Sequence, residues 1–411
     1  MFTLWQSLNS DGRLLFAARS LRLFAYGFLA VVLALYLASL GLSDADVGLL
    51  LSLTLLGDTV ISLWITTTAD HWGRRRMLLI GALLMLFAGA LFAVTRQFEW
   101  LLLAGIVGVI SPSGKEVGPF LSIEQAALAQ IVPNERRTET FAWYNLAGSL
   151  TTALGAFVGG AATQFMENSG ASGPDVYRPV VWGYALAGIL LAALFLRLTP
   201  AVDHPPRAVG HAPQPPTARF GLHKSRGVVA KLSALFALDA FAGGFIIDSL
   251  AALWLVRRFE ADPLVIGTVF FWTNLLGGLS GLAAAKLAQK FGLVNTMVFT
   301  HLPSNVLLML VPLMPSLWSA AAMLFARSCI SQMDIPTRQA YTMAVVEPDE
   351  RSAASGVTTV ARSLGASLSP LLVGPMLANP ALMGLPFFLA GGIKIVYDLL
   401  LYRQFVKVPE R

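Results

Sequence analysis

The stretch Asp70-His71-Trp72-Gly73-Arg74-Arg75-Arg76 joins two long apolar runs, and it decides the fold. The runs, 47–69 and 77–94, each approach the roughly 20 residues that a helix needs to cross about 30 Å of hydrocarbon. Three consecutive arginines between two such helices are typical of a cytoplasmic turn. The stretch therefore predicts a membrane protein that keeps this loop on the cytoplasmic side.

The composition of the 411 residues agrees with this prediction, because 56% are hydrophobic and only 13% are charged. A soluble globule needs more polar surface than that. Apolar runs separated by polar breaks predict about twelve spans, and their length favours helices over barrel strands. We expect an all-α membrane protein with spans at 22–42, 47–69, 76–95, 100–131, 137–162, 179–198, 229–256, 264–288, 293–314, 317–346, 352–377 and 384–406.

The basic residues set the expected orientation, because cytoplasmic loops collect Lys and Arg. With the N-terminus inside, most of the 29 basic residues fall at cytoplasmic positions, including Arg13 and Arg19 before the first span and Arg22 at its start. We therefore expect a multi-pass protein of the inner (plasma) membrane with both termini in the cytoplasm. The net charge of +6 is explained by this topology and by contact with anionic lipid, not by nucleic-acid binding.

Two similar halves are visible in the sequence. Gly48 and Gly73 bracket the second expected helix, as Gly267 and Gly292 bracket the eighth. Between the halves the apolar pattern stops and prolines accumulate, which is typical of a flexible linker. We expect pseudo-symmetric six-helix bundles over 1–198 and 228–411, joined by a cytoplasmic linker over 199–227. Repeated halves of this kind are typical of transporters whose site lies between them.

The opening motif, Asp70-x-x-Gly73-Arg74-Arg75, resembles the signature of the major facilitator superfamily, and the resemblance extends over the whole chain. In that family a Gly stands four residues before the Asp and a basic residue usually follows it, whereas this chain has Thr66 and His71. The resemblance implies that Asp70 docks near the cytoplasmic start of helix eleven and that Arg74 pairs with an acid on a neighbouring helix. Asp70, Gly73, Arg74 and Arg75 would then hold the inner gate closed.

The second half has lost the charges of this motif. Gln289 takes the place of Asp70, and Leu293, Val294 and Asn295 take the places of the arginines. We therefore expect the gating contacts to depend on the N-terminal copy.

Ionisable residues inside membrane spans are expensive and therefore mark candidate functional sites. We expect the coupled proton to be carried by one of three acids, which are Asp58, Glu116 and Glu124. The candidates for binding the substrate are Asp239, Asp248, Arg327, Asp334, Arg338 and Arg362. The resemblance implies that helices one, four, seven and ten, which carry most of these residues, line a central cavity.

Spacing predicts how some of these residues lie. Glu116 and Glu124 are eight residues apart and should share a face of helix four, near a kink or an unwound segment at prolines and glycines 112–119. Gly243-Gly244 should loosen helix seven in the same way. Arg327, Asp334 and Arg338 should form one stripe on helix ten. An alternative interpretation is that the charges only neutralise one another, Asp334 with Arg338 and Lys394 with Asp398.

The leading functional hypothesis is a secondary transporter that exports a small organic solute in exchange for protons. The alternative is uptake or exchange of an organic anion by the C-terminal arginines, and a more distant one is a membrane enzyme or a non-transporting sensor. We expect no enzyme activity, no cofactor and no metal site, since the sequence has neither a nucleotide-binding loop nor a metal-ligand pattern. The expected partners are the solute, protons and membrane lipid, with the chain acting as a monomer.

Overall fold

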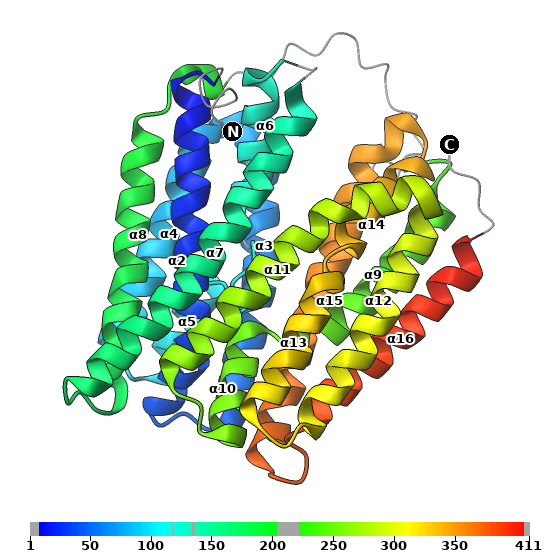
Figure 1. Ribbon diagram of the computed structural model, residues 1–411. Coiled ribbons are helices and arrows are strands. Elements are labelled where there is room, and N and C mark those ends of the chain that lie inside the picture. Colours follow the sequence, from blue (N-terminus) through cyan, green and yellow to red (C-terminus); the bar gives the residue numbers. More distant parts are fainter. Residues whose placement is uncertain (1–7, 117, 134–135, 204–221, 407–411) are drawn as a thin grey trace. The chain divides into compact units, whose positions relative to one another are not determined.

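The computed structural model describes residues 8–116, 118–133, 136–203 and 222–406, with the backbone alone at Asp70, Thr138, Pro348 and Ser352. The secondary-structure elements of these ranges are helices (Figure 1). In the N-terminal part they are α2 (Ser10–Ser39), α3 (Asp44–Trp72), α4 (Arg74–Val94), α5 (Phe98–Val107), α6 (Phe120–Ile131), α7 (Arg137–Asn168), η2 (Gly173–Val176), α8 (Arg178–Leu196) and η3 (Pro200–Val202).

The C-terminal part is built in the same way. Its elements are α9 (Arg226–Gly244), α10 (Asp248–Phe259), α11 (Pro263–Phe291), α12 (Leu293–Leu310), η4 (Val311–Leu313), α13 (Leu317–Ser331), α14 (Asp334–Ala344), η5 (Pro348–Glu350), α15 (Arg351–Ala378) and α16 (Leu385–Phe405).

The membrane-spanning prediction agrees with these helices. Among the described residues, 10 helical segments are long and apolar enough to cross a membrane, and one of them, Arg226–Phe259, joins α9 to α10. The other two predicted spans, 100–131 and 317–346, are each divided into two shorter helices, α5 with α6 and α13 with α14. Twelve spans follow when the divided ones are included.

Each of the three divided helices has a local cause in the sequence. Between α5 and α6, Gly114 and Gly118 take positive φ angles of 63° and 81°, which glycine tolerates better than other residues. Helix α9 ends at Gly244, the second glycine of the predicted weak point. Pro336, in the first turn of α14, has no backbone N–H to donate to the preceding turn, which weakens the helix where α13 ends. The first two breaks were predicted, and the third was not.

The first helix begins much earlier than predicted. Helix α2 starts at Ser10, where the Asn9 side chain accepts a hydrogen bond from the Gly12 N–H at 2.8 Å and caps the helix. Arg19 and Arg22 therefore lie inside the helix and are buried. The predicted start of this span at residue 22 is wrong, because partners on other helices, which a span search does not consider, allow Arg19 and Arg22 to be buried.

The chain forms two compact units, Met1–Ala208 with Asp248–Leu275, and Val209–Ile247 with Leu276–Arg411. In the first unit α2 packs against α7, α8 and α10. Gly155 of α7 allows this close approach, because a side chain there would collide with the Phe24 carbonyl of α2. In the second unit α9 packs against α15 and α16, and α12 packs against α13, α14 and α16.

The sharp turn in the opening motif is made by glycine. Gly73 separates α3 from α4 with φ at 96°, and Gly292 separates α11 from α12 with φ at 83°. Both positions lie in the region where L side chains are strained. The two halves therefore keep the glycine turn of the motif although the second half has lost its charges.

The two ends of the predicted linker are anchored, each within its own unit. In the first unit, the Thr199 hydroxyl donates to Asp11 at 2.6 Å, and the backbone N–H of Arg75 donates to Asp203 at 2.8 Å. In the second unit, the Glu350 carboxylate accepts from the backbone N–H groups of His223, Lys224 and Ser225, just before α9. Residues 204–221, which make up most of the linker, lie outside the described part of the chain.

Glu350 is a charged cap for the start of α9. Its side chain is fully buried, which by itself raises the pKa of the carboxyl, but hydrogen bonds from the Ser225 hydroxyl and from the three backbone amides outweigh this effect and lower the pKa to about 2. Because the pKa is lower in the folded protein than in an unfolded chain, at about 4.3, the charged cap stabilises the fold above pH 4.3. This contribution is lost as the pH falls from there towards 2.

We expect Glu350→Gln to lower the melting temperature of the detergent-purified protein, since hydrogen bonds to a charged group contribute about 1.5–3 kcal/mol each. Both variants are compared in a His223→Gln background, because that imidazole lies 3.4 Å from Glu350. There the difference in melting temperature should be constant between pH 5 and 8, because both pKa values of the Glu350 carboxyl lie below this window. Asp349→Asn is the matched control, since that side chain is largely exposed. A difference that grows or shrinks between pH 5 and 8 would show that Glu350 does not act as this titrating cap.

Candidate functional site

The first unit contains a buried ion cluster centred on Arg22 of α2. Its guanidinium donates to Glu124 of α6 through two nitrogens, at 2.6 and 2.8 Å, and to Glu116 at 3.0 Å. Arg22 and Glu124 have no exposed side-chain surface, and Glu116 has 17%. Such a cluster is tolerable in a membrane span because each buried charge is paired and hydrogen-bonded.

Further contacts fix this cluster from α7. The Tyr144 hydroxyl donates to Glu124 at 2.5 Å, and Arg19 binds Glu116 at 3.0 Å while donating to Asn145 at 3.2 Å. The two predicted proton-coupling acids of helix four therefore meet at one guanidinium. They do not share a helix face as predicted, because Glu116 lies in the unwound segment before α6.

Asp58 of α3, the third predicted proton-coupling acid, has different surroundings. Its carboxylate is half-buried, accepts from the Ser62 hydroxyl at 3.4 Å and lies near the Gly118 backbone amide. Among the described residues no Lys, Arg or His forms an ion pair with it. Asp58 is thus an intramembrane acid that its own unit leaves without a neutralising cation.

The second unit concentrates cations around one acid. Asp239 of α9 contacts Lys394 of α16 at 2.5 Å, Arg362 of α15 at 3.0 Å and Arg338 of α14 at 3.3 Å. Arg338 also binds Asp334 at 2.7 Å. We call these five residues the Asp239 cluster. Its three cations exceed its two acids, and Arg362, with a side chain 32% exposed, is its most accessible member.

The structure brings four of the six predicted substrate-binding residues, Asp239, Asp334, Arg338 and Arg362, together in this cluster. Arg327 lies on α13 and Asp248 at the start of α10, so neither is part of it. The predicted stripe on helix ten is interrupted between α13 and α14. The predicted contact between Asp334 and Arg338 is present.

The other predicted pair, Lys394 with Asp398, is wrong as an ion pair. Lys394 binds Asp239, and Asp398 binds His301 of α12 at 2.9 Å and accepts from Asn305 at 3.0 Å. Residues four apart on a helix can meet, but each of these finds a nearer partner on another helix.

Comparison with known proteins identifies the family. Residues 15–370 match the model of the Major Facilitator Superfamily. The chain belongs to this superfamily. It is therefore a multi-pass integral membrane protein that transports a solute, and not an enzyme.

Several known proteins resemble the chain along almost its whole length. The membrane protein YJR124C of Saccharomyces cerevisiae is 29% identical, covering 100% of this chain and 97% of its own. The quinolone resistance protein NorA of Staphylococcus aureus is 23% identical, and the match covers 90% of this chain and 92% of NorA.

Solved structures of transporters share the fold. A mutant form of the nucleoside transporter NupG superimposes with a TM-score of 0.77 at 14% identity, covering 96% of this chain and 100% of that one. The human organic anion transporter MFSD10 superimposes with a TM-score of 0.66 at 17% identity, covering 95% of this chain and 98% of that one.

The superfamily motif contributes local contacts in the first unit. The side chain of Asp70 lies outside the described part of the structure. Arg74 is buried, and the Arg75 guanidinium donates to the carbonyls of Phe195 at 3.2 Å and Leu196 at 2.5 Å. A cation at these carbonyls, which end α8, is stabilised by the helix dipole. The gating role of Asp70, Gly73, Arg74 and Arg75 stays a prediction.

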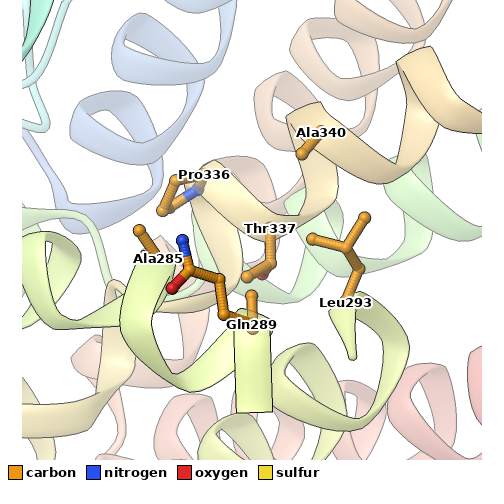
Figure 2. Close-up of a pocket in the computed structure, with 7 residues that line it drawn as sticks. Ala285, Gln289, Leu293, Pro336, Thr337 and Ala340 are labelled. Carbon is orange, nitrogen blue, oxygen red and sulfur yellow. The ribbon is translucent and has the colours of Figure 1, made fainter. Parts of the chain in front are cut away.

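The second copy of the motif lines a pocket. Figure 2 shows Gln289 and Ala285 of α11 facing Pro336 and Thr337 of α14, with Leu293 and Ala340 beside them. The pocket has a volume of about 310 Å³, and its lining side chains carry no charge.

Sequence reasoning missed the roles of three residues, which are Arg19, Arg22 and His301, the partner of Asp398. Arg19 was placed before the first span and Arg22 at its cytoplasmic start, although 14–18 continue the apolar pattern in front of the predicted span. The signal that could have identified them was the excess of acids over bases in the N-terminal spans. His301 lies in an apolar span, where an ionisable residue is itself a functional signal.

We expect Arg22→Met to destabilise the protein by about 3–5 kcal/mol, because it leaves two buried carboxylates without their shared cation. Thermal unfolding in detergent measures this effect. Arg76→Met, which removes an exposed arginine, should change little. The triple variant Arg22→Met with Glu116→Gln and Glu124→Gln should recover much of the loss. If Arg22→Met melted like the unmodified protein, the cluster would not be needed for folding.

Proposed function

We propose that the chain is a proton-coupled exporter, a secondary transporter that moves a small organic solute out of the cell in exchange for protons by alternating access. The observation that carries this proposal is the isolated carboxylate of Asp58, which lies inside α3 without an ion pair among the described residues. We infer that it works as a monomer in the inner (plasma) membrane with both termini in the cytoplasm, as the basic residues predict.

Asp58 is better suited to exchange protons than the two other candidate acids. Glu124 accepts two hydrogen bonds from Arg22 and one from Tyr144, so a proton could bind it only by breaking these contacts. Glu116 is held by Arg19 and Arg22. An acid with weaker contacts can hold a proton while the solute is absent and release it when the solute binds. The inward-open and outward-open conformations then differ in their affinities for protons and for solute.

The relatives support the outward direction and an organic solute. NorA, 23% identical over most of both chains, is named for quinolone resistance, and removal of a drug from the cell is one way in which a transporter confers resistance. Quinolones are therefore reasonable first probes for this chain.

We expect Asp58→Asn to abolish proton-driven transport while leaving solute exchange intact. Purified protein in liposomes with an acidic lumen is given the fluorescent quinolone norfloxacin, and its accumulation is followed as protons leave. In Asp58→Asn, accumulation should fall to that of protein-free vesicles, because the variant has no proton to exchange. Norfloxacin exchange between equal concentrations should continue.

Asp46→Asn, in the first turn of the same helix, is the matched control and should behave like the unmodified protein. Gradient-driven accumulation in Asp58→Asn at the unmodified rate would exclude Asp58 as the coupling residue. Failure of the unmodified protein to respond to the gradient would overturn the proposal of proton coupling.

A second candidate function is uptake or exchange of an organic anion, favoured by the excess of cations in the Asp239 cluster. The resemblance in fold to MFSD10, which is named an organic anion transporter, is compatible with it. Naphthalene-2-sulfonate, whose charge is constant between pH 5 and 8, is a suitable probe.

Exchange of this probe in the absence of a pH gradient should be lost in Arg362→Ala and retained in Asp58→Asn. Arg403→Ala, which removes an exposed arginine of α16, is the control. Exchange that survives Arg362→Ala would exclude anion binding at the Asp239 cluster.

A further inference from the structure

The second unit contains a buried His–Asp pair that neither proposed function uses. His301 of α12 is 3% exposed and Asp398 of α16 is 1% exposed. The Nδ1 atom of His301 lies 2.9 Å from Asp398, whose other oxygen accepts from Asn305 at 3.0 Å. With an ionised carboxylate, this geometry favours a proton on Nδ1 and leaves Nε2 to accept a second one.

The pair adjoins the Asp239 cluster. Asp398 lies one helical turn from Lys394, which binds Asp239 at 2.5 Å. His301 is also close enough to Asp239 for their charges to interact. The Tyr397 ring stands edge-on to the imidazole at 6.1 Å between centroids. The surrounding helices also carry further charged residues, which are Arg327 of α13, Asp334 and Arg338 of α14, Arg351 and Arg362 of α15, Arg403 of α16, and Arg226 and Lys231 of α9.

The charges of the pair and the cluster balance when the imidazole is neutral. Three cations, Lys394, Arg338 and Arg362, then face three carboxylates, those of Asp239, Asp334 and Asp398. One proton added to His301 leaves an excess of one positive charge. Imidazole is the side chain whose charge ordinarily changes between pH 5 and 8, and His301 is the imidazole among these groups.

We propose that His301 and Asp398 form a proton-binding site that sets the charge of the Asp239 cluster and thereby its affinity for an anionic group of the solute, which enters at Arg362. Arg362 is the point of entry because its side chain is 32% exposed, whereas the other members of the cluster are buried. A positive charge on His301 strengthens the binding of an anion throughout the Asp239 cluster, including at Arg362. This follows because Coulomb energy falls slowly with distance in a medium of low dielectric constant.

This inference rests on the transport function and deepens the second candidate by naming the proton that accompanies the anion. It is independent of Asp58, which lies in the other unit. A purely structural role, in which His301 only ties α12 to α16, predicts no effect of pH on anion binding. The two roles are therefore separated by a pH profile.

The first experiment observes the proton directly. His71, His204, His211 and His223 are replaced by Gln, so that His301 is the remaining histidine of the full chain. Nitrogen NMR of the 15N-histidine-labelled protein should show one imidazole that gains a proton between pH 8 and 5. A ring that keeps one protonation state throughout this range would overturn the proposal.

The second experiment measures the consequence for binding. The affinity of the purified protein for naphthalene-2-sulfonate should be roughly tenfold higher at pH 5.5 than at pH 8, as expected for one additional charge near the anion. His301→Asn keeps a donor close to the position of Nδ1 but cannot titrate, so its affinity should be the same at both pH values. His71→Gln, which removes an exposed histidine, should retain the pH dependence of the unmodified protein.

A pH-independent affinity of the unmodified protein, or a pH-dependent one in His301→Asn, would overturn the proposed coupling. If His301→Asn does not fold, His301→Gln replaces it, and the NMR titration tests the proton site without either variant. Absence of anion binding at every pH would contradict the anion part of this proposal and the second candidate function. Absence of proton coupling at Asp58 would contradict only the proposed proton-coupled export.

Discussion

Neutralisation of buried charge is the constraint on which the rest of this structure depends. Arg22 has no exposed surface, and a guanidinium in a membrane span is stable only if carboxylates of good geometry meet it. Glu116 and Glu124 supply them, one from an unwound segment and one from α6. The ion cluster thus joins α2 to a broken helix, and the break itself brings the second acid within reach.

The two units solve this problem differently. The first pairs Arg19 and Arg22 with acids and leaves Asp58 without an ion pair among its described neighbours, whereas the second surrounds Asp239 with three cations. A lone carboxylate suits proton exchange, and a cluster rich in cations suits an anionic group. The similarity of the halves is therefore one of helices and glycine turns, and the chemistry of each half is its own.

Local features were predictable from the sequence, and long-range partners were not. Prolines and glycines 112–119 indicated the break between α5 and α6, because their effect on the backbone is local. The start of α2 was misplaced, since Arg19 and Arg22 resemble the cytoplasmic border of a span until Glu116 is seen beside them. Intramembrane acids were identified by their cost in lipid, but nothing local assigns Lys394 to Asp239 when the two are far apart in sequence.

The sharing of Asp239 among cations on three helices also limits how this protein can evolve. A change at a single cation leaves the carboxylate with two partners, whereas loss of the carboxylate leaves Lys394 and Arg362 without an acid at once, and Arg338 with Asp334 alone. Substitutions in this region should therefore appear first at Lys394, Arg338 or Arg362, with Asp239 changing only after them. The order in which mutations can accumulate is set by the number of partners that each buried charge has to satisfy.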